Sequence, residues 1–316
     1  MSNRRIALAL APLLLAACGD HPAVVLQLNN KTVGPIFLSP GGLQYGWASI
    51  ADAQGVPLLL SASSCASDAP QQGFEIVAPA PAGPQRLDPG SSAELRWDGL
   101  IYRARAGSSC YDQVPAPAGR YNVTICWDYQ DTNTGGSEQV CALESFELSS
   151  TRELVHNVIA TPPAPTALSL LNDSASSVWI SSFGFDASNP SWVSLRDPAG
   201  QPVVQPGACS CICNRACALC ARAAVAPQPR AEELLPGQSR LSSFNGIILS
   251  TVTTPGGGSC ALPVLAPAGT YQARFCWGLG HTGEAAGAGA DFLSDVRCED
   301  KGFELGVQTD VVLKLR

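Results

Sequence analysis

The chain is poor in charge, in histidine and in long apolar runs. Only 14% of its 316 residues are aspartate, glutamate, lysine or arginine, against about 25% in typical soluble domains. Acidic residues outnumber basic ones by 26 to 19, and no basic patch stands out that would neutralise phosphates, so we expect no nucleic acid partner. The apolar stretch at residues 6–17 is too short to cross a bilayer comfortably.

The sequence also lacks the patterns that mark an enzyme. Its three histidines, His21, His156 and His281, are scattered, and no serine or cysteine stands in a recognisable nucleophile motif. No glycine-rich phosphate loop follows an expected strand. Glu232 and Glu233 precede a turn, where carboxylates are solvated. We therefore expect no catalytic residues, no cofactor and no enzyme activity.

Long helical patterns are missing as well, because 30 glycines and 25 prolines interrupt the chain every few residues. In place of helical patterns, the sequence shows short segments in which apolar and polar residues alternate. Residues 121–125 and 271–275 alternate apolar and polar side chains, which is typical of a strand with one buried face and one solvent-exposed face. Frequent turn signals between such segments predict an all-β fold.

One block of sequence occurs twice, at residues 87–127 and 235–277. Each copy begins with a Pro-Gly turn, passes an Asp-Gly or Asn-Gly turn and a cysteine, and then reads Ala-Pro-Ala-Gly, Tyr and Cys-Trp. The match extends outwards, since residues 25–29 resemble 168–172 and residues 146–148 resemble 303–305. Trp179, opposite Ile36, stands outside this scheme. The chain therefore contains a duplicated module.

We predict two tandem immunoglobulin-like β-sandwich domains at residues 25–160 and 166–316, each able to fold alone. Residues 161–165 are rich in proline and form a stiff, extended linker by composition. The Pro-Gly, Trp-Asp-Gly and Ala-Gly-x-Tyr order resembles bacterial immunoglobulin-like modules, including those of the BsuPI proteinase-inhibitor type. This resemblance covers about the C-terminal half of each repeat. It implies the sandwich fold and offers proteinase inhibition as an alternative function.

The N-terminus is typical of an exported lipoprotein. Arg4 and Arg5 precede the apolar run, and the Leu-Ala-Ala-Cys motif that ends at Cys18 resembles the bacterial lipobox. We predict a signal peptide at residues 1–17, lipidation of Cys18 and a polar tether at residues 18–24. Gly19 follows the cysteine, and the absence of aspartate there favours the outer membrane, on its periplasmic face or at the cell surface.

Twelve cysteines remain besides Cys18, and an exported chain can oxidise them in pairs. Successive residues of a strand face opposite sides of the sheet. Counting from the inward-facing aromatic and aliphatic residues therefore places one pair of cysteines in each repeat on the outer face of the sheet. Parity therefore predicts the bridges Cys126–Cys141 and Cys276–Cys298. Elimination leaves Cys65 with Cys110.

The second repeat replaces Cys65 by a Cys-rich insertion at residues 209–220, with Cys209, Cys211, Cys213, Cys217 and Cys220. One of these cysteines would pair with Cys260, and the other four would form two local bridges. The last three are spaced as in radical iron–sulfur enzymes, but that chemistry needs a reducing compartment and another fold. Zinc or copper binding by thiolates, or a redox role, is the other alternative. We expect an oxidised, metal-free loop.

These observations predict a lipid-anchored envelope protein that serves as a binding or structural module through its loops. Its expected partners are the membrane, through the lipid, and an envelope protein or glycan that the sequence does not identify.

Overall fold

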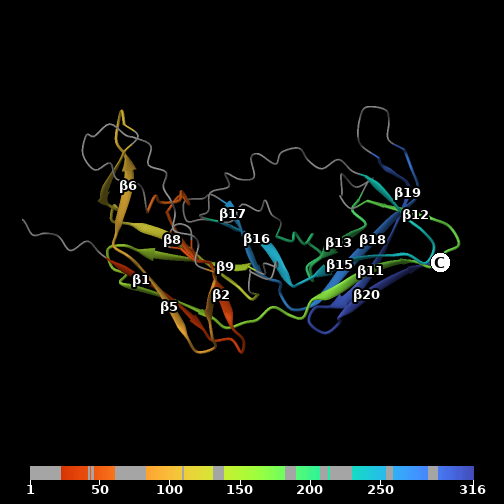
Figure 1. Cartoon of the computed structure of the whole chain (residues 1–316), viewed down its shortest axis with the longest axis horizontal. Helices are drawn as coiled ribbons and strands as arrows, with labels where there is room; N and C mark the ends of the chain where they lie inside the picture. The colour runs from red at the N-terminus through yellow and green to blue at the C-terminus, as the bar shows by residue number, and fades with distance from the viewer. Residues whose placement is uncertain are drawn as a thin grey trace, which may run out of the picture.

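The computed structural model describes residues 23–41, 43, 46–60, 83–108, 110–130, 139–181, 190–206, 213, 230–253, 259–283 and 291–316. These residues form strands, turns and bends and contain no helix, so the all-β prediction is confirmed. Two β-sandwiches lie one after the other along the long axis of the molecule (Figure 1). The predicted signal peptide, residues 1–17, and most of the predicted tether lie outside the described residues.

Among the described residues, each repeat contributes ten strands, and the second ten follow the first ten in the same order. The strands of repeat one are β1 (Val24–Asn30), β2 (Ile36–Leu38), β3 (Ala48–Asp52), β4 (Gln85–Leu87), β5 (Ser92–Trp97), β6 (Leu100–Ala104), β7 (Tyr111–Pro115), β8 (Arg120–Asp128), β9 (Gln139–Glu147) and β10 (Glu153–Val158). Those of repeat two are β11 (Thr166–Asn172), β12 (Val178–Ser181), β13 (Val193–Arg196), β14 (Ala231–Leu234), β15 (Ser239–Phe244), β16 (Ile247–Thr253), β17 (Ser259–Leu265), β18 (Thr270–His281), β19 (Leu293–Glu304) and β20 (Asp310–Leu315).

The pairing of strands is duplicated in detail. In repeat one, β1 pairs in parallel with β10 and antiparallel with β5, and β8 pairs with β3, β2 and β9. In repeat two, β11 pairs in the same way with β20 and β15, and β18 with β13, β12 and β19. β4 pairs with β2 and β14 pairs with β12 at equivalent sheet edges, while β6–β7 and β16–β17 form separate hairpins. The repeat that the sequence shows is therefore a repeat of the whole topology.

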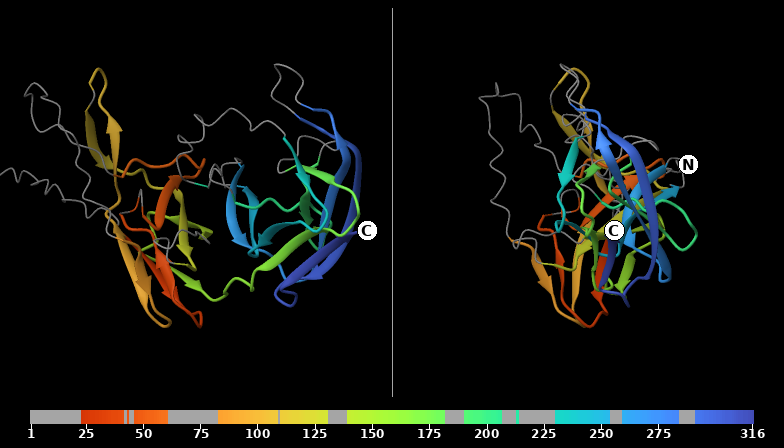
Figure 2. Two further views of the ribbon diagram at one scale, coloured as in Figure 1. Left: turned by 45° about the vertical axis from the view of Figure 1, so that its right-hand side comes forward. Right: turned by 90° about the vertical axis from the view of Figure 1, so that its right-hand side faces the viewer.

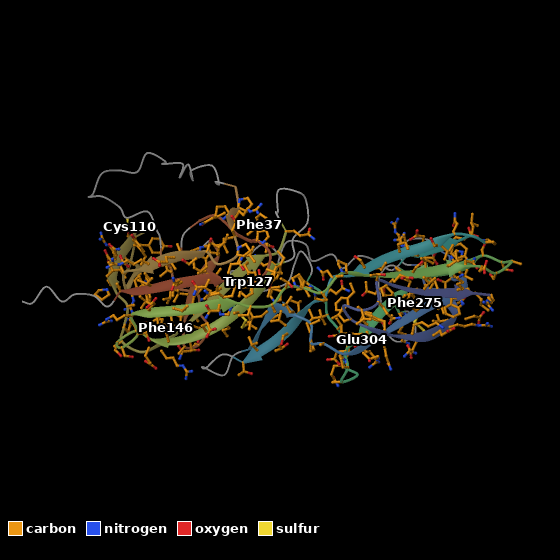
Figure 3. All side chains as sticks on the ribbon, turned by 90° about the horizontal axis from the view of Figure 1, so that it is seen from below. Phe37, Cys110, Trp127, Phe146, Phe275 and Glu304 are labelled. Carbon is orange, nitrogen blue, oxygen red and sulfur yellow. A yellow bond between two sulfur atoms is a disulfide. The ribbon has the colours of Figure 1, made fainter. Side chains whose placement is uncertain are left out.

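Each sandwich has its own aromatic core. Trp97, Tyr121 and Phe146 pack together in repeat one, with ring centroids 5.4 to 6.1 Å apart. Phe244, Tyr271 and Phe303 hold the same places in repeat two. Figure 3 shows Phe146 and Phe275 inside their separate sandwiches. Offset and edge-on aromatic contacts of this kind add to the burial of apolar surface.

The Ala-Pro-Ala-Gly-x-Tyr motif has a structural role in both copies. The Tyr121 hydroxyl donates to the Pro117 carbonyl at 2.7 Å, and the Tyr271 hydroxyl donates to the Pro267 carbonyl at 2.8 Å. Each bond ties a core tyrosine to the turn four residues before it, as in the tyrosine corner of immunoglobulin-type sandwiches. Burial, aided by the Asp197 carboxylate, raises the pKa of Tyr271 to about 12, so this hydroxyl stays a donor at physiological pH.

One expectation about the sheets is wrong for repeat one. In repeat two, β18 alternates as predicted, with Gln272 and Arg274 exposed and Ala273 buried. In repeat one, β8 is buried on both faces, and Asn122 and Thr124 have no exposed surface. The outer face of repeat one is therefore covered, and part of the cover comes from repeat two.

Candidate functional site: the hairpin junction between the repeats

The hairpins β6–β7 and β16–β17 leave their sandwiches through equivalent turns. Gly99 and Gly246 both have φ 73°, a left-handed conformation that glycine adopts without strain. The side chain before each glycine accepts a hydrogen bond from the next strand, since Leu100 N donates to Asp98 Oδ1 and Ile247 N donates to Asn245 Oδ1. The Asp-Gly and Asn-Gly signals of the sequence thus set the direction in which each hairpin projects.

Hairpin β16–β17 packs on the other repeat. Figure 1 shows it between the two sandwiches, with β17 beside β9, and the two strands are in contact. Ile247 is 1% exposed and belongs to the hydrophobic core of repeat one, and Leu265 packs against that same core. The next residue, Ile248, packs against the core of repeat two. Neighbouring residues of one strand therefore contribute to two different cores.

A second apolar cluster, which we call the junction, joins the outer face of β8–β9 to the hairpin. It contains two disulfides, Cys126–Cys141 from repeat one and Cys213–Cys260 from repeat two. The apolar residues packed with them are Leu143 on β9 and Val252, Leu262 and Val264 on the hairpin. Leu262 is 3% exposed and the Cys126–Cys141 disulfide is buried, so the centre of this contact is closed to water, while Leu143, Val252 and Val264 are partly buried around it.

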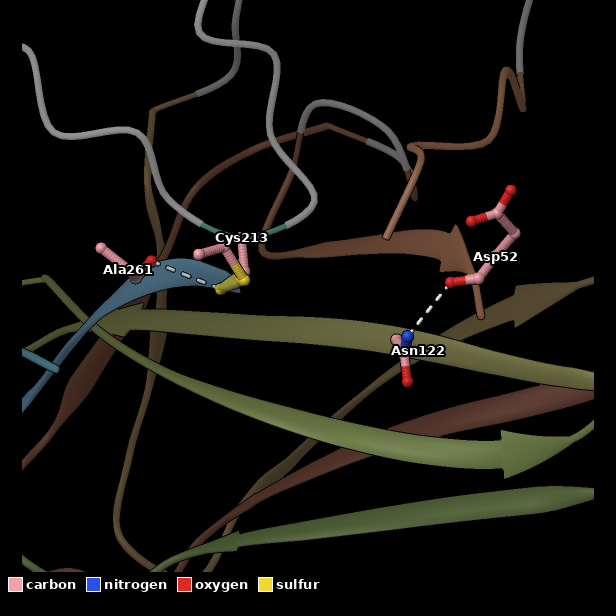
Figure 4. The surroundings of a disulfide bond; sticks show 5 residues. Asp52, Asn122, Cys213 and Ala261 are labelled. Carbon is pink, nitrogen blue, oxygen red and sulfur yellow. Dashed lines mark hydrogen bonds between the residues drawn. A yellow bond between two sulfur atoms is a disulfide. The ribbon is translucent and has the colours of Figure 1, made fainter. Parts of the chain in front are cut away.

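The Cys-rich insertion is fastened to the junction at Cys213. Its amide donates to the Ala261 carbonyl at 3.0 Å, next to its disulfide partner Cys260. Figure 4 shows this disulfide on β17, above the strands of repeat one that carry Asn122 and Asp52. The Asn122 amide donates to the Asp52 carbonyl at 3.1 Å and ties β8 to the end of β3.

The described cysteines are all oxidised. Cys126–Cys141 and Cys276–Cys298 are the pairs that strand parity predicts, with Cα atoms 4.1 Å apart on directly opposed residues in both cases. They join neighbouring strands of one sheet, unlike the immunoglobulin bridge between sheets. Cys110 is also disulfide-bonded, and because the other six described cysteines pair among themselves, its partner lies outside the described residues.

The remaining predicted cysteine sites fall outside the described residues. They are the lipidation site Cys18, the predicted partner of Cys110, and four cysteines of the insertion: Cys18, Cys65, Cys209, Cys211, Cys217 and Cys220. In the part of the chain that the structure describes, no cluster of histidine, cysteine, aspartate and glutamate could hold a metal ion. The same part contains no helix that could span a membrane.

One pair of titratable residues resembles part of a catalytic site. His281 Nδ1 lies 2.9 Å from Asp291 Oδ2 at the end of β18–β19, and the His281 ring stacks on Trp179 with centroids 3.7 Å apart. A histidine oriented by a carboxylate also requires a nucleophile to catalyse acyl transfer. Among the described residues, no serine, threonine or cysteine forms a hydrogen bond with the His281 ring. The pair links the end of β18 to the residues that lead into β19.

The register also corrects the position of Trp179. Ile36 pairs with Leu87 and Val178 pairs with Leu234, so Trp179 corresponds to Phe37 and not to Ile36. Both aromatic residues lie one place further along the second strand of their repeats. The shift of one residue begins in the first strand, because alternation matches residues 25–29 with residues 168–172 whereas the structure matches Asn30 with Asn172.

The junction is the feature that sequence reasoning missed. Its residues are ordinary apolar residues of a hairpin, and nothing local indicates that they contact the other repeat. A comparison of the copies could have found it, because Val252 and Leu262 are apolar where repeat one has Arg105 and Asp112. Apolar side chains at outward positions of only one copy indicate a contact that only this copy makes.

No protein-family model matches the chain and no curated protein matches it, so the resemblance to BsuPI-type modules has no support from these comparisons. Several solved structures are similar over most of its length. A leucine-rich repeat protein from Bacteroides thetaiotaomicron is 10% identical, with 93% of this chain and 26% of that chain covered and a TM-score of 0.19. A streptococcal ancillary pilin is 11% identical, with 94% and 63% covered and a TM-score of 0.25.

The shaft pilin spaA from Lactobacillus rhamnosus GG is 10% identical, with 92% of this chain and 96% of that chain covered and a TM-score of 0.20. The chain spans less than two thirds of the length of the first two proteins. At TM-scores this low, the likeness carries no argument about function or assembly. The all-β fold and the disulfides of the chain itself fit a structural or binding module.

Proposed function

We propose that the chain is an exported, lipid-anchored envelope protein that holds two β-sandwiches as one rigid body and presents the second at a fixed distance from the membrane. The observation that carries the proposal is the junction. Two domains joined only by a flexible linker would not share a core residue, yet Ile247 of hairpin β16–β17 belongs to the core of repeat one. A protein that positions a contact surface benefits from such rigidity, because less entropy is lost on binding.

The position of the proposed anchor sets which end of the molecule faces the membrane. Val24, the first residue of β1, is opposite Trp97, and the Trp97 indole donates to the Leu100 carbonyl at the start of β6. A tether of residues 18–24 spans at most about 25 Å when fully extended. A lipid on Cys18 would therefore hold the β6–β7 end of repeat one close to the membrane. Repeat two would lie on the far side and carry the contact with an envelope protein or glycan.

The anchor is tested by replacing Cys18 with serine in the full-length chain expressed in its own compartment. We expect Cys18→Ser to move the protein from the membrane fraction to the soluble fraction, because the thiol is the atom that carries the lipid. His21→Ala, in the same tether, is the matched control and should remain in the membrane fraction. If Cys18→Ser stays membrane-bound after washing with high salt, the anchor assignment is wrong.

The thiolate alternative has a separate test, since metal ligation and a disulfide scaffold differ in free thiols. Cys213 cannot ligate a metal in the state seen here, because it is bonded to Cys260. We propose that the other cysteines of the insertion are oxidised as well. Titration of the unfolded, non-reduced protein should then find no free thiol, whereas four or more would favour a metal or redox role for residues 209–220.

A further inference from the structure

Each repeat carries a hairpin and an outer sheet face, but among the described residues only hairpin β16–β17 meets the outer sheet face of a repeat. Hairpin β16–β17 lies on the outer face of β8–β9, as described above. The equivalent hairpin β6–β7 projects at one end of the molecule, and the equivalent face of β18–β19 lies at the other end (Figure 2). Each end of the molecule therefore presents one half of a contact of this kind, a hairpin at one end and a sheet face at the other.

The unused hairpin differs from the docked one at the positions that make the contact. Counted from the equivalent turn glycines and cysteines, Arg105 replaces Val252 and Asp112 replaces Leu262. Two nitrogens of the Arg105 guanidinium, Nε and Nη2, donate hydrogen bonds to the Asp112 carboxylate, and these bonds lower the pKa of Asp112. The two side chains are 53% and 46% exposed, whereas Leu262 is buried.

The outer face of β18–β19 likewise carries charged residues where the outer face of β8–β9 does not. Two residues before the cysteine of β18, Arg274 stands where repeat one has Thr124. Two residues after the cysteine of β19, Asp300 stands where repeat one has Leu143. These residues are directly opposed in both registers, and Arg274 Nε lies 4.0 Å from Asp300 Oδ1. Their side chains are 46% and 54% exposed.

We propose that hairpin β6–β7 and the outer face of β18–β19 are the two halves of a head-to-tail contact between copies of this chain, and that the two ion pairs keep copies from making it. Docking in the geometry of the junction would bury four charged side chains in an apolar contact, and such burial costs more than the pairs regain. A contact between different surfaces of identical molecules leaves one half of the contact at each end of the assembly, so without these charges the chain would grow into open fibres, or into rings where the rotation between copies closes. The arrangement corresponds to the polar outer faces that end a stack of repeats.

The test gives each of these two surfaces the residues of its docked counterpart, in the full chain. A hairpin variant carries Arg105→Val and Asp112→Leu, and a face variant carries Arg274→Thr and Asp300→Leu. We expect each variant alone to be monomeric by light scattering after size exclusion at tens of micromolar. An equimolar mixture should form a complex of twice the mass, and the chain with all four substitutions should form a concentration-dependent series of oligomers.

Two controls distinguish this specific contact from non-specific association of the new apolar side chains. Arg86→Val with Asp88→Leu removes another exposed ion pair of repeat one, and Arg240→Thr with Glu232→Leu removes one of repeat two. These variants should remain monomeric alone, and each should remain so when mixed with its counterpart. If the hairpin variant fails to fold, residues 247–265 can replace residues 100–115, because that hairpin already folds in this chain.

Three results would overturn the proposal. The first is a mixture of folded hairpin and face variants that remains monomeric, since the surfaces then do not fit. The second is a hairpin variant that dimerises alone as readily as in the mixture, since the contact is then between hairpins. The third is wild-type protein that already forms the oligomer series, since the ion pairs then prevent nothing.

Discussion

A buried asparagine at the end of the first strand organises each repeat. Asn172 Nδ2 donates to the carbonyls of Ser176 and Leu234, at 2.9 and 2.8 Å, and its Oδ1 accepts from the amide and hydroxyl of Ser174. Asn30 makes the same four bonds in repeat one with Gly34, Leu87 and Thr32. Both side chains are fully buried. Each therefore joins the turn after the first strand to the strand that returns beside it.

This geometry requires a side chain that donates twice and accepts twice, which an amide does and a carboxylate does not. We expect Asn172→Asp to lower the free energy of unfolding by about 2–4 kcal/mol, because it leaves two carbonyls without donors and buries a charge near them. Denaturant unfolding measures the loss. Asn157→Asp is the matched control, since Asn157 is exposed and only its Oδ1 accepts a bond, from Asn29. Equal losses in both variants would contradict the role given to Asn172.

The sequence alone matches Asn172 with the wrong residue of repeat one, one position away from Asn30. Alternation matches residues 25–29 with residues 168–172, whereas the structure matches Asn30 with Asn172. An asparagine at a strand end reads as a turn signal in any sequence. That its side chain is buried with four partners depends on Leu87 and Leu234, about 60 residues further along the chain, and no local pattern contains that information.

At the scale of the elements, turns and strand parity are predictable and contacts between hairpin and sheet are not. The Asp-Gly and Asn-Gly turns, the core tyrosines and the parity of Cys126 and Cys276 follow from short segments with a fixed period. The face that a hairpin covers depends on where its sandwich lies. The outer face of β8 was therefore expected to be solvent-exposed, and it is buried because another repeat reaches it.

The linker shows the same dependence on context. Its prolines were expected to form an extended spacer, and the structure packs Pro163 on two turns of repeat two. A Cβ on Gly246 would lie 2.7 Å from Pro163 Cδ, and one on Gly306 would lie 3.2 Å from Pro163 Cβ. The Tyr129 hydroxyl donates to the Ala160 carbonyl just before the linker. The chain is thus held just before the linker, at Ala160, and at its middle residue, Pro163.

We expect Gly246→Ala to destabilise repeat two more than Gly237→Ala does. Both glycines are left-handed, with φ of 73° and 80°, and alanine costs about 1–2 kcal/mol in this conformation. At Gly246 the added Cβ would also collide with the Pro163 ring, whereas a Cβ on Gly237 meets nothing within 4 Å. Thermal melts should show a loss of about 3 kcal/mol for Gly246→Ala. Equal shifts in melting temperature for the two variants would show that Pro163 is not fixed against the turn.

At the scale of the whole molecule, the junction makes the two repeats depend on each other. The sequence predicts that each folds alone, and each does have its own aromatic core. However, Ile247 and Leu265 of repeat two complete the core of repeat one. Residues 23–160 by themselves would expose Leu143, the Cys126–Cys141 disulfide and the part of the core that Ile247 covers. The stability of repeat one should therefore depend on an element that lies about 90 residues beyond its last strand.

Leu262→Asp in the full-length chain tests this dependence. The substitution places on hairpin β16–β17 the residue that hairpin β6–β7 carries at the same position, Asp112, so a hairpin of this kind tolerates it. The cost therefore falls on the junction, where an unpaired carboxylate would be buried against Cys126 and Leu143, and we expect a loss of about 3–5 kcal/mol. Calorimetry should show repeat one melting at a lower temperature, close to that of isolated residues 23–160. Asp112→Ala should leave both repeats unchanged, because this side chain is half exposed and contacts no other domain among the described residues. If Leu262→Asp lowers the melting temperature of repeat two alone, the repeats are independent bodies and the rigid arrangement on which the proposed function rests is wrong.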